Sequence, residues 1–216
     1  FGVQYLLKLD LTGKLCIDIG ANREIFSYWM HQKIGPNGKV IAFEPQEELN
    51  TKLKELRTSF RLSQLEIAGI GLSCRKQTLR MIRPINHWGG ASVENTGSLG
   101  ESEEFDIKLI KLDSYLNQES RKRIGFIKCD VEGHELDVIQ GAVNSIKASA
   151  PKILIECHGA VNENCDTFDL LESLNYKGFF FHEGGLCANE NYLKYRNSGL
   201  IHRKAMTDFV FIPNTN

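Results

Sequence analysis

Short apolar runs of strand length alternate with longer stretches in which apolar residues recur at helical spacing. Residues 15–19 and 39–43 are nearly all apolar, which is typical of strands buried on both faces. Residues 25–34 between them place Ile25, Phe26, Trp29 and Met30 on one helical face, and the sequence Gly-Pro-Asn-Gly at 35–38 ends that helix. The pattern predicts a β-α-β unit.

The same alternation continues to the end of the chain and predicts a doubly wound α/β fold. At 216 residues, the chain is of a length that one such domain, residues 1–216, commonly fills. A segment rich in Gly and Ser, residues 86–100, is expected to form a loop over the site, where Trp88 and His87 could contact an acceptor. Further strands are predicted at 65–70, 77–82, 105–109, 126–129, 153–156, 178–181 and 208–212, and further helices at 2–9, 47–60, 135–146 and 167–174.

Polar residues cluster where the first two strands end, at the sheet edge where open α/β sheets bind ligands. Gly20 allows a tight turn, and Glu44 can accept two hydrogen bonds from a ribose diol. Asn22 either caps the following helix or touches a cofactor. The sequence lacks G-x-G-x-x-G, which argues against a dinucleotide. S-adenosylmethionine fits better, since Asp18 could meet its ammonium group, and Ile70, at the end of the third strand, is also expected to contact the cofactor.

The later strands are expected to bring a second polar group to this edge, formed by Asp130, Glu132, Glu156 and His158. Methyl transfer to a hydroxyl requires positioning and a base. We assign His158 as the base, with Glu132 in reserve, and Asp130 as the residue that orients cofactor and acceptor. Lys128 is expected to extend to the surface or pair with an acid, and His134 is interpreted as a surface residue.

Charge, apolar stretches and cysteine spacing indicate which partners and which cell compartment to expect. Lys and Arg total 26 against 27 Asp and Glu, so net charge gives no reason to expect nucleic acid or an anionic membrane as partner. No apolar stretch approaches the roughly 20 residues that span a bilayer, and no secretory signal opens the chain. The 6 cysteines contain no C-x-x-C pair. We therefore expect a cytoplasmic protein with reduced thiols and no cysteine-bound metal.

Several motifs together resemble the FkbM-type methyltransferase family in content, order and spacing. They are D-I-G-A-N at 18–22, F-E-P at 43–45, L-D-S at 112–114, I-K-C-D-V-E-G-H-E at 127–135 with G-A at 141–142, and I-E-C-H at 155–158. The resemblance implies a Rossmann-like sheet of seven strands, with an antiparallel last strand beside the sixth. It also implies an S-adenosylmethionine enzyme that methylates a hydroxyl on a sugar or natural product. The family usually has glycine where this chain has Glu24.

Other functions stay open on the sequence alone. A divalent metal held by Asp130, Glu156 and His158 could replace the base by lowering the pKa of the acceptor hydroxyl. Glu24 in the glycine position could mark a cofactor-binding module without turnover. A nicotinamide dehydrogenase ranks last for lack of glycines. The acceptor is expected to be a small molecule or a glycan, and the residues do not predict its identity or the oligomeric state.

Overall fold

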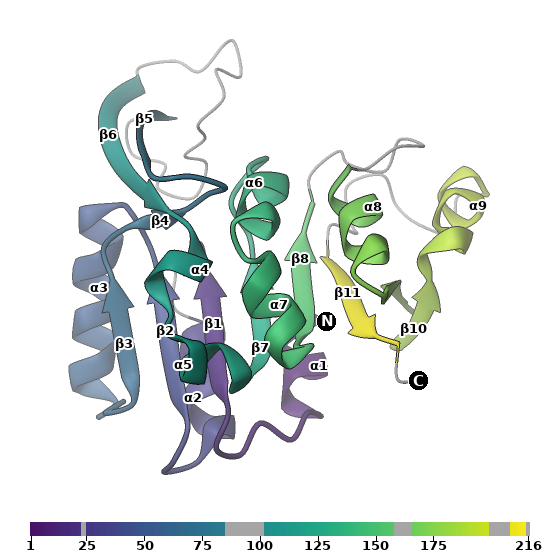
Figure 1. The fold of residues 1–216 in the computed structure, drawn as a ribbon, viewed down its shortest axis with the longest axis horizontal. Coiled ribbons are helices and arrows are strands. Elements are labelled where there is room, and N and C mark those ends of the chain that lie inside the picture. The colour runs from purple at the N-terminus through teal and green to yellow at the C-terminus, as the bar shows by residue number, and fades with distance from the viewer. Residues whose placement is uncertain (23–24, 85–101, 158–165, 199–207, 215–216) are drawn as a thin grey trace.

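A central β-sheet with helices on both faces forms the body of the protein (Figure 1). The computed structural model describes residues 1–22, 25–84, 102–157, 166–198 and 208–214. Within these residues the central sheet has 8 strands in the order β10-β9-β11-β8-β7-β1-β2-β3. These strands are β1 (Leu15–Ile19), β2 (Lys39–Phe43), β3 (Leu65–Ala68), β7 (Ile124–Cys129), β8 (Lys152–Glu156), β9 (Tyr176–His182), β10 (Gly185–Ala188) and β11 (Asp208–Pro213).

The expected doubly wound sheet is confirmed, with one addition at its edge. Strands β3, β2, β1, β7 and β8 are parallel, and β11 lies antiparallel between β8 and β9. The predicted antiparallel last strand beside the sixth is therefore present. The predicted number of seven strands is too low, because β10 pairs antiparallel with β9 through a turn at Glu183 and Gly184, both of which have positive φ.

Alternate residues of the parallel strands supply two cores, one on each face of the sheet. Ile17 and Ile19 of β1 face one core, which also contains Val138 and Ile146. Cys16 belongs to the core on the other face. The first core is covered by α4 (Leu112–Tyr115), α6 (Glu135–Gln140), α7 (Val143–Ser149), α8 (Asp166–Ser173) and α9 (Tyr192–Asn197), and the second by α1 (Gly2–Leu7), α2 (Ile25–Ile34) and α3 (Glu47–Ser59).

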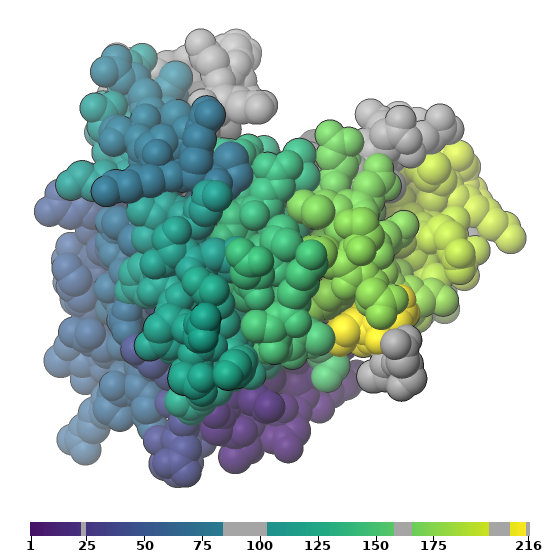
Figure 2. Space-filling model, in the orientation of Figure 1, coloured from purple at the N-terminus to yellow at the C-terminus, as the bar shows by residue number. Residues whose placement is uncertain are grey.

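A smaller sheet projects from the body of the molecule (Figures 1 and 2). It has the order β4-β6-β5, from β4 (Gly71–Leu72), β5 (Gln77–Pro84) and β6 (Ser102–Ile110). Strands β5 and β6 form a long antiparallel hairpin over the expected strands at 77–82 and 105–109. The loop expected at 86–100, with Trp88 and His87, lies outside the described residues.

The single helix predicted at 135–146 is wrong, because the structure divides it at Gly141. A Cβ on Gly141 would lie 2.0 Å from the Ser73 carbonyl oxygen, so the backbone is pressed against the β4 segment here. The new N-terminus of α7 is capped by Asp113, whose carboxylate accepts the N–H groups of Asn144 at 3.0 Å and Ser145 at 2.8 Å. The Asp113 N–H also donates to the Gly141 carbonyl oxygen at 3.0 Å, so the motifs L-D-S and G-A contact one another. A short helix not predicted, α5 (Gln118–Lys122), and the 3-10 turn η1 (Asn189–Asn191) complete the described elements.

Two further findings bear on the expectations from composition. No helix in the described part of the chain is long and apolar enough to cross a membrane. The cysteines whose placement is described, namely Cys16, Cys74, Cys129, Cys157 and Cys187, are free thiols.

Candidate active site

The ends of β1 and β7 meet at Gly20. From β1 the sheet continues through β2 and β3 on one side and through β7 and β8 on the other, so the strand order switches direction here. Gly20 has a φ of 69°, and a Cβ there would lie 1.8 Å from the carbonyl oxygen of Asp130. The Asp130 N–H in turn donates to the Ile19 carbonyl oxygen at 3.1 Å. Only glycine fits this position. Because it has no side chain, it leaves space in the crevice where doubly wound sheets bind ligands.

A pocket opens at this crevice, the place where doubly wound sheets bind ligands. Its polar part comes from the ends of the central strands, and its apolar part includes Met81, Ile107 and Leu109 of the hairpin. Of the residues assigned to the site from the sequence, those that line this pocket are Gly20, Asn22, Glu44, Asp130 and Glu132.

Glu44 is held rigidly at the end of β2. Its side chain is 3% exposed, and each carboxylate oxygen accepts one backbone N–H, Oε1 from Gln46 at 2.9 Å and Oε2 from Asn22 at 3.1 Å. Asn50 of α3 fixes the same turn by donating to the carbonyl oxygens of Glu44 and Gln46. Burial raises the pKa of Glu44, and the two backbone hydrogen bonds oppose that shift. A carboxylate oxygen can accept more than one hydrogen bond, so Glu44, which lines the pocket, keeps acceptor capacity for a ligand.

Asp130 is oriented by Lys128, a lysine buried beside the pocket. The Lys128 ammonium donates to Asp130 Oδ2 at 3.1 Å and to the Gly20 carbonyl oxygen at 3.0 Å. Burial by itself lowers the pKa of Lys128, but the charges of Asp18 and Asp130 outweigh it and the pKa is raised. The expectation that Lys128 pairs with an acid is confirmed, and it does so at the turn that forms the site.

The structure places Asp18 behind the pocket, not in it. Its side chain is fully buried, accepts from Ser27 Oγ of α2 at 2.6 Å and lies 4.0 Å from the Lys128 ammonium. Burial raises the pKa of Asp18. Asp18 is therefore placed beside Lys128 and does not line the pocket itself. Ile70 packs against the core and is not among the pocket-lining residues of the described chain.

Two residues of the second polar group line the pocket, a third does not, and the fourth is outside the part of the chain that the structure describes. Asp130 and Glu132 line the pocket, and Glu132 adopts a φ of 53° in the turn that leads to Gly133. Glu156 ends β8, one strand further from the crevice. His158 and Glu24 lie outside the described residues. The described part of the chain holds no group of three His, Cys, Asp or Glu side chains able to bind a metal, and two of the three ligands of the metal-dependent alternative, Asp130 and Glu156, fall within that part.

His134 is a pocket residue that sequence reasoning placed on the surface. Its side chain is 16% exposed, and its Nε2 lies 3.0 Å from Ser73 Oγ while its Nδ1 lies 3.6 Å from the Asp137 carboxylate. Ser73 comes from the segment after β4, 61 residues earlier in the chain. The only local signal for His134 was its place directly after Glu132 and Gly133.

The mostly parallel sheet with its antiparallel strand β11, together with the pocket at the β1–β7 crevice, defines a Rossmann-like α/β fold. The sequence model described as "Methyltransferase FkbM domain" matches residues 18–181, and the chain belongs to this family. The expected family is thus confirmed, and S-adenosylmethionine is the cofactor of this class.

Two named proteins and one solved structure are similar to this chain. The chain is 29% identical over 153 residues to methyltransferase sdnD of Sordaria araneosa, covering 58% of this chain and 59% of that protein. It is 25% identical over 176 residues to the AMB antimetabolite synthetase AmbE of Pseudomonas aeruginosa, covering 66% of this chain but 8% of that protein. The crystal structure of methyltransferase FkbM from Methylobacillus flagellatus KT has the same fold, with a TM-score of 0.60, 17% identity, and coverage of 94% of this chain and 45% of that one. The chain thus spans less than two thirds of each of these proteins.

Proposed function

We propose that this chain transfers a methyl group from S-adenosylmethionine to a hydroxyl group of a small molecule, a sugar or another natural product, and that residues 1–216 act as one domain. The observation that carries the proposal is the Glu44 carboxylate, which lines the pocket and is fixed by two backbone N–H groups, with acceptor capacity left over. Such a carboxylate matches the two hydroxyls of a ribose.

The charge of the pocket supports a cationic cofactor. Glu44, Asp130 and Glu132 line it, and Lys128 is bonded to one of them, Asp130. An excess of carboxylates attracts a sulfonium or ammonium group and repels a pyrophosphate. This agrees with the lack of G-x-G-x-x-G in the sequence.

The chain's own residues must orient the acceptor and remove its proton. When bound, S-adenosylmethionine supplies an activated methyl group, so the protein needs mainly to align the acceptor oxygen. Asp130, held by Lys128, is proposed to orient the acceptor, and His158 is proposed as the base that takes the hydroxyl proton, with Glu132 in reserve. The apolar hairpin wall suits the carbon skeleton of an acceptor or the adenine ring.

The small-molecule acceptor is supported by one relative's name and by the shape of the site. AmbE is named as a synthetase of an antimetabolite, and its matching segment is a small part of that protein. The pocket is enclosed on one side by the hairpin, which favours a compact acceptor over a macromolecular surface.

The test is methyl transfer itself. The chain is incubated with methyl-labelled S-adenosylmethionine and a panel of monosaccharides and hydroxylated natural products, and the products are analysed by mass spectrometry. Label on an oxygen in a product supports the proposal, and Glu44→Ala should reduce that label when the cofactor concentration is below saturation. Tight binding of S-adenosylhomocysteine without transfer to any hydroxyl would instead favour the module without turnover. Loss of transfer on adding a chelator would favour the metal-assisted mechanism.

A further inference from the structure

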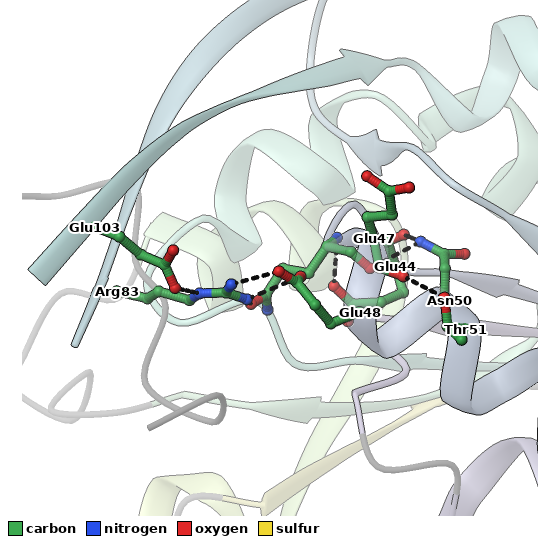
Figure 3. A network of polar contacts seen from close by, with 8 residues as sticks. Glu44, Glu47, Glu48, Asn50, Thr51, Arg83 and Glu103 are labelled. Atoms are coloured by element: carbon green, nitrogen blue, oxygen red, sulfur yellow. Dashed lines mark hydrogen bonds and ion pairs between the residues drawn. The ribbon is translucent and has the colours of Figure 1, made fainter. Parts of the chain in front are cut away.

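A buried arginine joins the hairpin to the segment that carries Glu44 (Figure 3). Arg83 lies near the end of β5, and its side chain is 5% exposed. Its Nε donates to Glu103 Oε1 of β6 at 2.6 Å, while Nη1 and Nη2 donate to the two carboxylate oxygens of Glu48 at 3.1 and 2.7 Å. Glu48 lies in the first turn of α3, so the guanidinium bridges the hairpin and the body of the protein.

The buried guanidinium of Arg83 needs its ion pairs and hydrogen bonds, because a buried charge without partners is unstable. A buried charge is costly unless it is paired and hydrogen-bonded, and the planar fork of arginine matches a carboxylate with two parallel bonds. Both conditions are met here, since Arg83 binds two carboxylates and also lies 5.0 Å above the ring of Phe105. Arg80, on the same strand, is a contrast: its side chain is 66% exposed, and its ion pairs with Glu104 and Asp106 stay within the hairpin.

Gln46 connects this bridge to the proposed ribose site. Its side-chain Oε1 accepts from Arg83 Nη1 at 2.9 Å, and its backbone N–H donates to Glu44 Oε1 at 2.9 Å. Gln46 is also the N-cap residue of α3, although its side chain makes no capping bond. Arg83 thus hydrogen-bonds to the side chain of Gln46, whose backbone N–H orients Glu44.

We propose that Arg83 is a positioning residue for cofactor binding: by docking the β5–β6 hairpin on α3 it fixes Gln46, and through Gln46 it fixes Glu44. The inference rests on the proposed ribose-binding role of Glu44. Met81, Ile107 and Leu109 of the same hairpin line the pocket. Arg83 does not touch the cofactor in this scheme. By linkage, cofactor binding and hairpin docking stabilise each other.

The experiment measures S-adenosylhomocysteine affinity by calorimetry on the wild-type chain and on Arg83→Met, Arg83→Lys and the matched control Arg80→Met. Arg83→Met is expected to weaken binding by about tenfold, within the range typical of coupled sites. Arg83→Lys is expected to recover part of the loss, because an ammonium keeps the charge but not the paired bonds. Arg80→Met is expected to stay within about twofold of wild type, as is usual for exposed ion pairs.

A double-mutant cycle with Glu44→Gln separates positioning from general destabilisation. If Arg83 acts through Glu44, the loss caused by Arg83→Met shrinks to less than about twofold when Glu44 is already replaced. In addition, hydrogen exchange of the hairpin amides should slow on adding S-adenosylhomocysteine to the wild type, and slow less in Arg83→Met. If Arg83→Met does not fold, Gln46→Met removes the same link while leaving the Glu48 and Glu103 pairs of Arg83, and the same loss is expected.

The outcomes distinguish this inference from the function on which it rests. A wild-type chain that binds no S-adenosylhomocysteine overturns the proposed function and this inference together. A wild-type chain that binds, with an Arg83→Met variant that binds equally well or loses the same affinity in the Glu44→Gln background, overturns the inference alone.

Discussion

Replacing Glu44 is the most direct perturbation of the proposed cofactor site. In Glu44→Ala the ribose hydroxyls lose a charged acceptor, and hydrogen bonds to charged groups contribute about 1.5–3 kcal/mol each. The expected loss of S-adenosylmethionine affinity is therefore about tenfold or more, since about 1.4 kcal/mol corresponds to a factor of ten. The alanine variant also leaves the N–H groups of Asn22 and Gln46 without their acceptor, which lowers stability as well.

Glu44→Gln is the variant of the same shape: it loses the charge and keeps one acceptor oxygen, while its NH2 group faces one of the two backbone N–H groups that the carboxylate accepts. Burial raises the pKa of Glu44 in the folded state. An acid with a raised folded pKa binds its proton more tightly when folded, so its contribution to the free energy of unfolding is full below the unfolded pKa. That contribution is lost as the pH rises through the folded pKa. The free energy of unfolding of Glu44→Gln minus that of wild type, measured by urea denaturation, should therefore be larger at pH 8 than at pH 4.

Cofactor affinity should show the opposite pH dependence, because the ionised carboxylate is the better acceptor. Wild-type affinity should fall as the pH is lowered through the raised pKa of Glu44, whereas the affinity of Glu44→Gln should be nearly flat over the same range. Calorimetry at a series of pH values measures both. Unchanged affinity in Glu44→Ala, or parallel pH profiles in wild type and Glu44→Gln, would refute the ribose role.

Three further variants test the cap of α7, the turn at Gly20 and the proposed base. Asp113→Ala removes the cap of α7 and should lower the free energy of unfolding by about 1–2 kcal/mol, measured by urea denaturation; an unchanged midpoint would contradict the capping role. Gly20→Ala should abolish S-adenosylhomocysteine binding in calorimetry, because the Cβ would overlap the Asp130 carbonyl oxygen, and wild-type binding would show that the turn can rearrange. His158→Ala should keep cofactor binding but slow single-turnover methyl transfer by about a hundredfold to ten-thousandfold. A near-normal rate with an unchanged pH profile would move the base assignment to Glu132 and its Gln variant.

The sequence predicted the parts of the site that depend on strand ends. Gly20, Glu44 and Asp130 each follow a buried strand of a parallel sheet, and such strands end at one edge, so their convergence follows from the order of the elements. The pleat also explains why Asp18 is absent from the pocket. Successive side chains of a strand point to opposite faces, and Asp18 shares the face of Cys16, against α2.

The residues that the sequence did not reveal owe their place to contacts between distant segments. His134 reaches the pocket beside Ser73, and Arg83 is buried by Glu48, 35 residues earlier. The pleat of the strand places Arg83 on the face of Leu79 and Met81 and the exposed Arg80 on the opposite face, but no local pattern reveals that Glu48 pairs with Arg83. The division of α6 from α7 is of the same kind, because it depends on a carboxylate supplied from α4.

The pairing of β1 with β7 also bears on how the protein folds. Gly20 and Asp130 meet only after the chain has closed a loop that contains β2, β3 and the entire hairpin, and the adjoining contact between Arg123 and Gly13 spans 110 residues. Closing a loop of this length costs entropy that local helices and hairpins do not, and it slows folding. We therefore expect the first half of the chain to gain structure before the protein can bind its cofactor. A nascent chain on the ribosome would acquire the crevice only once β7 has emerged.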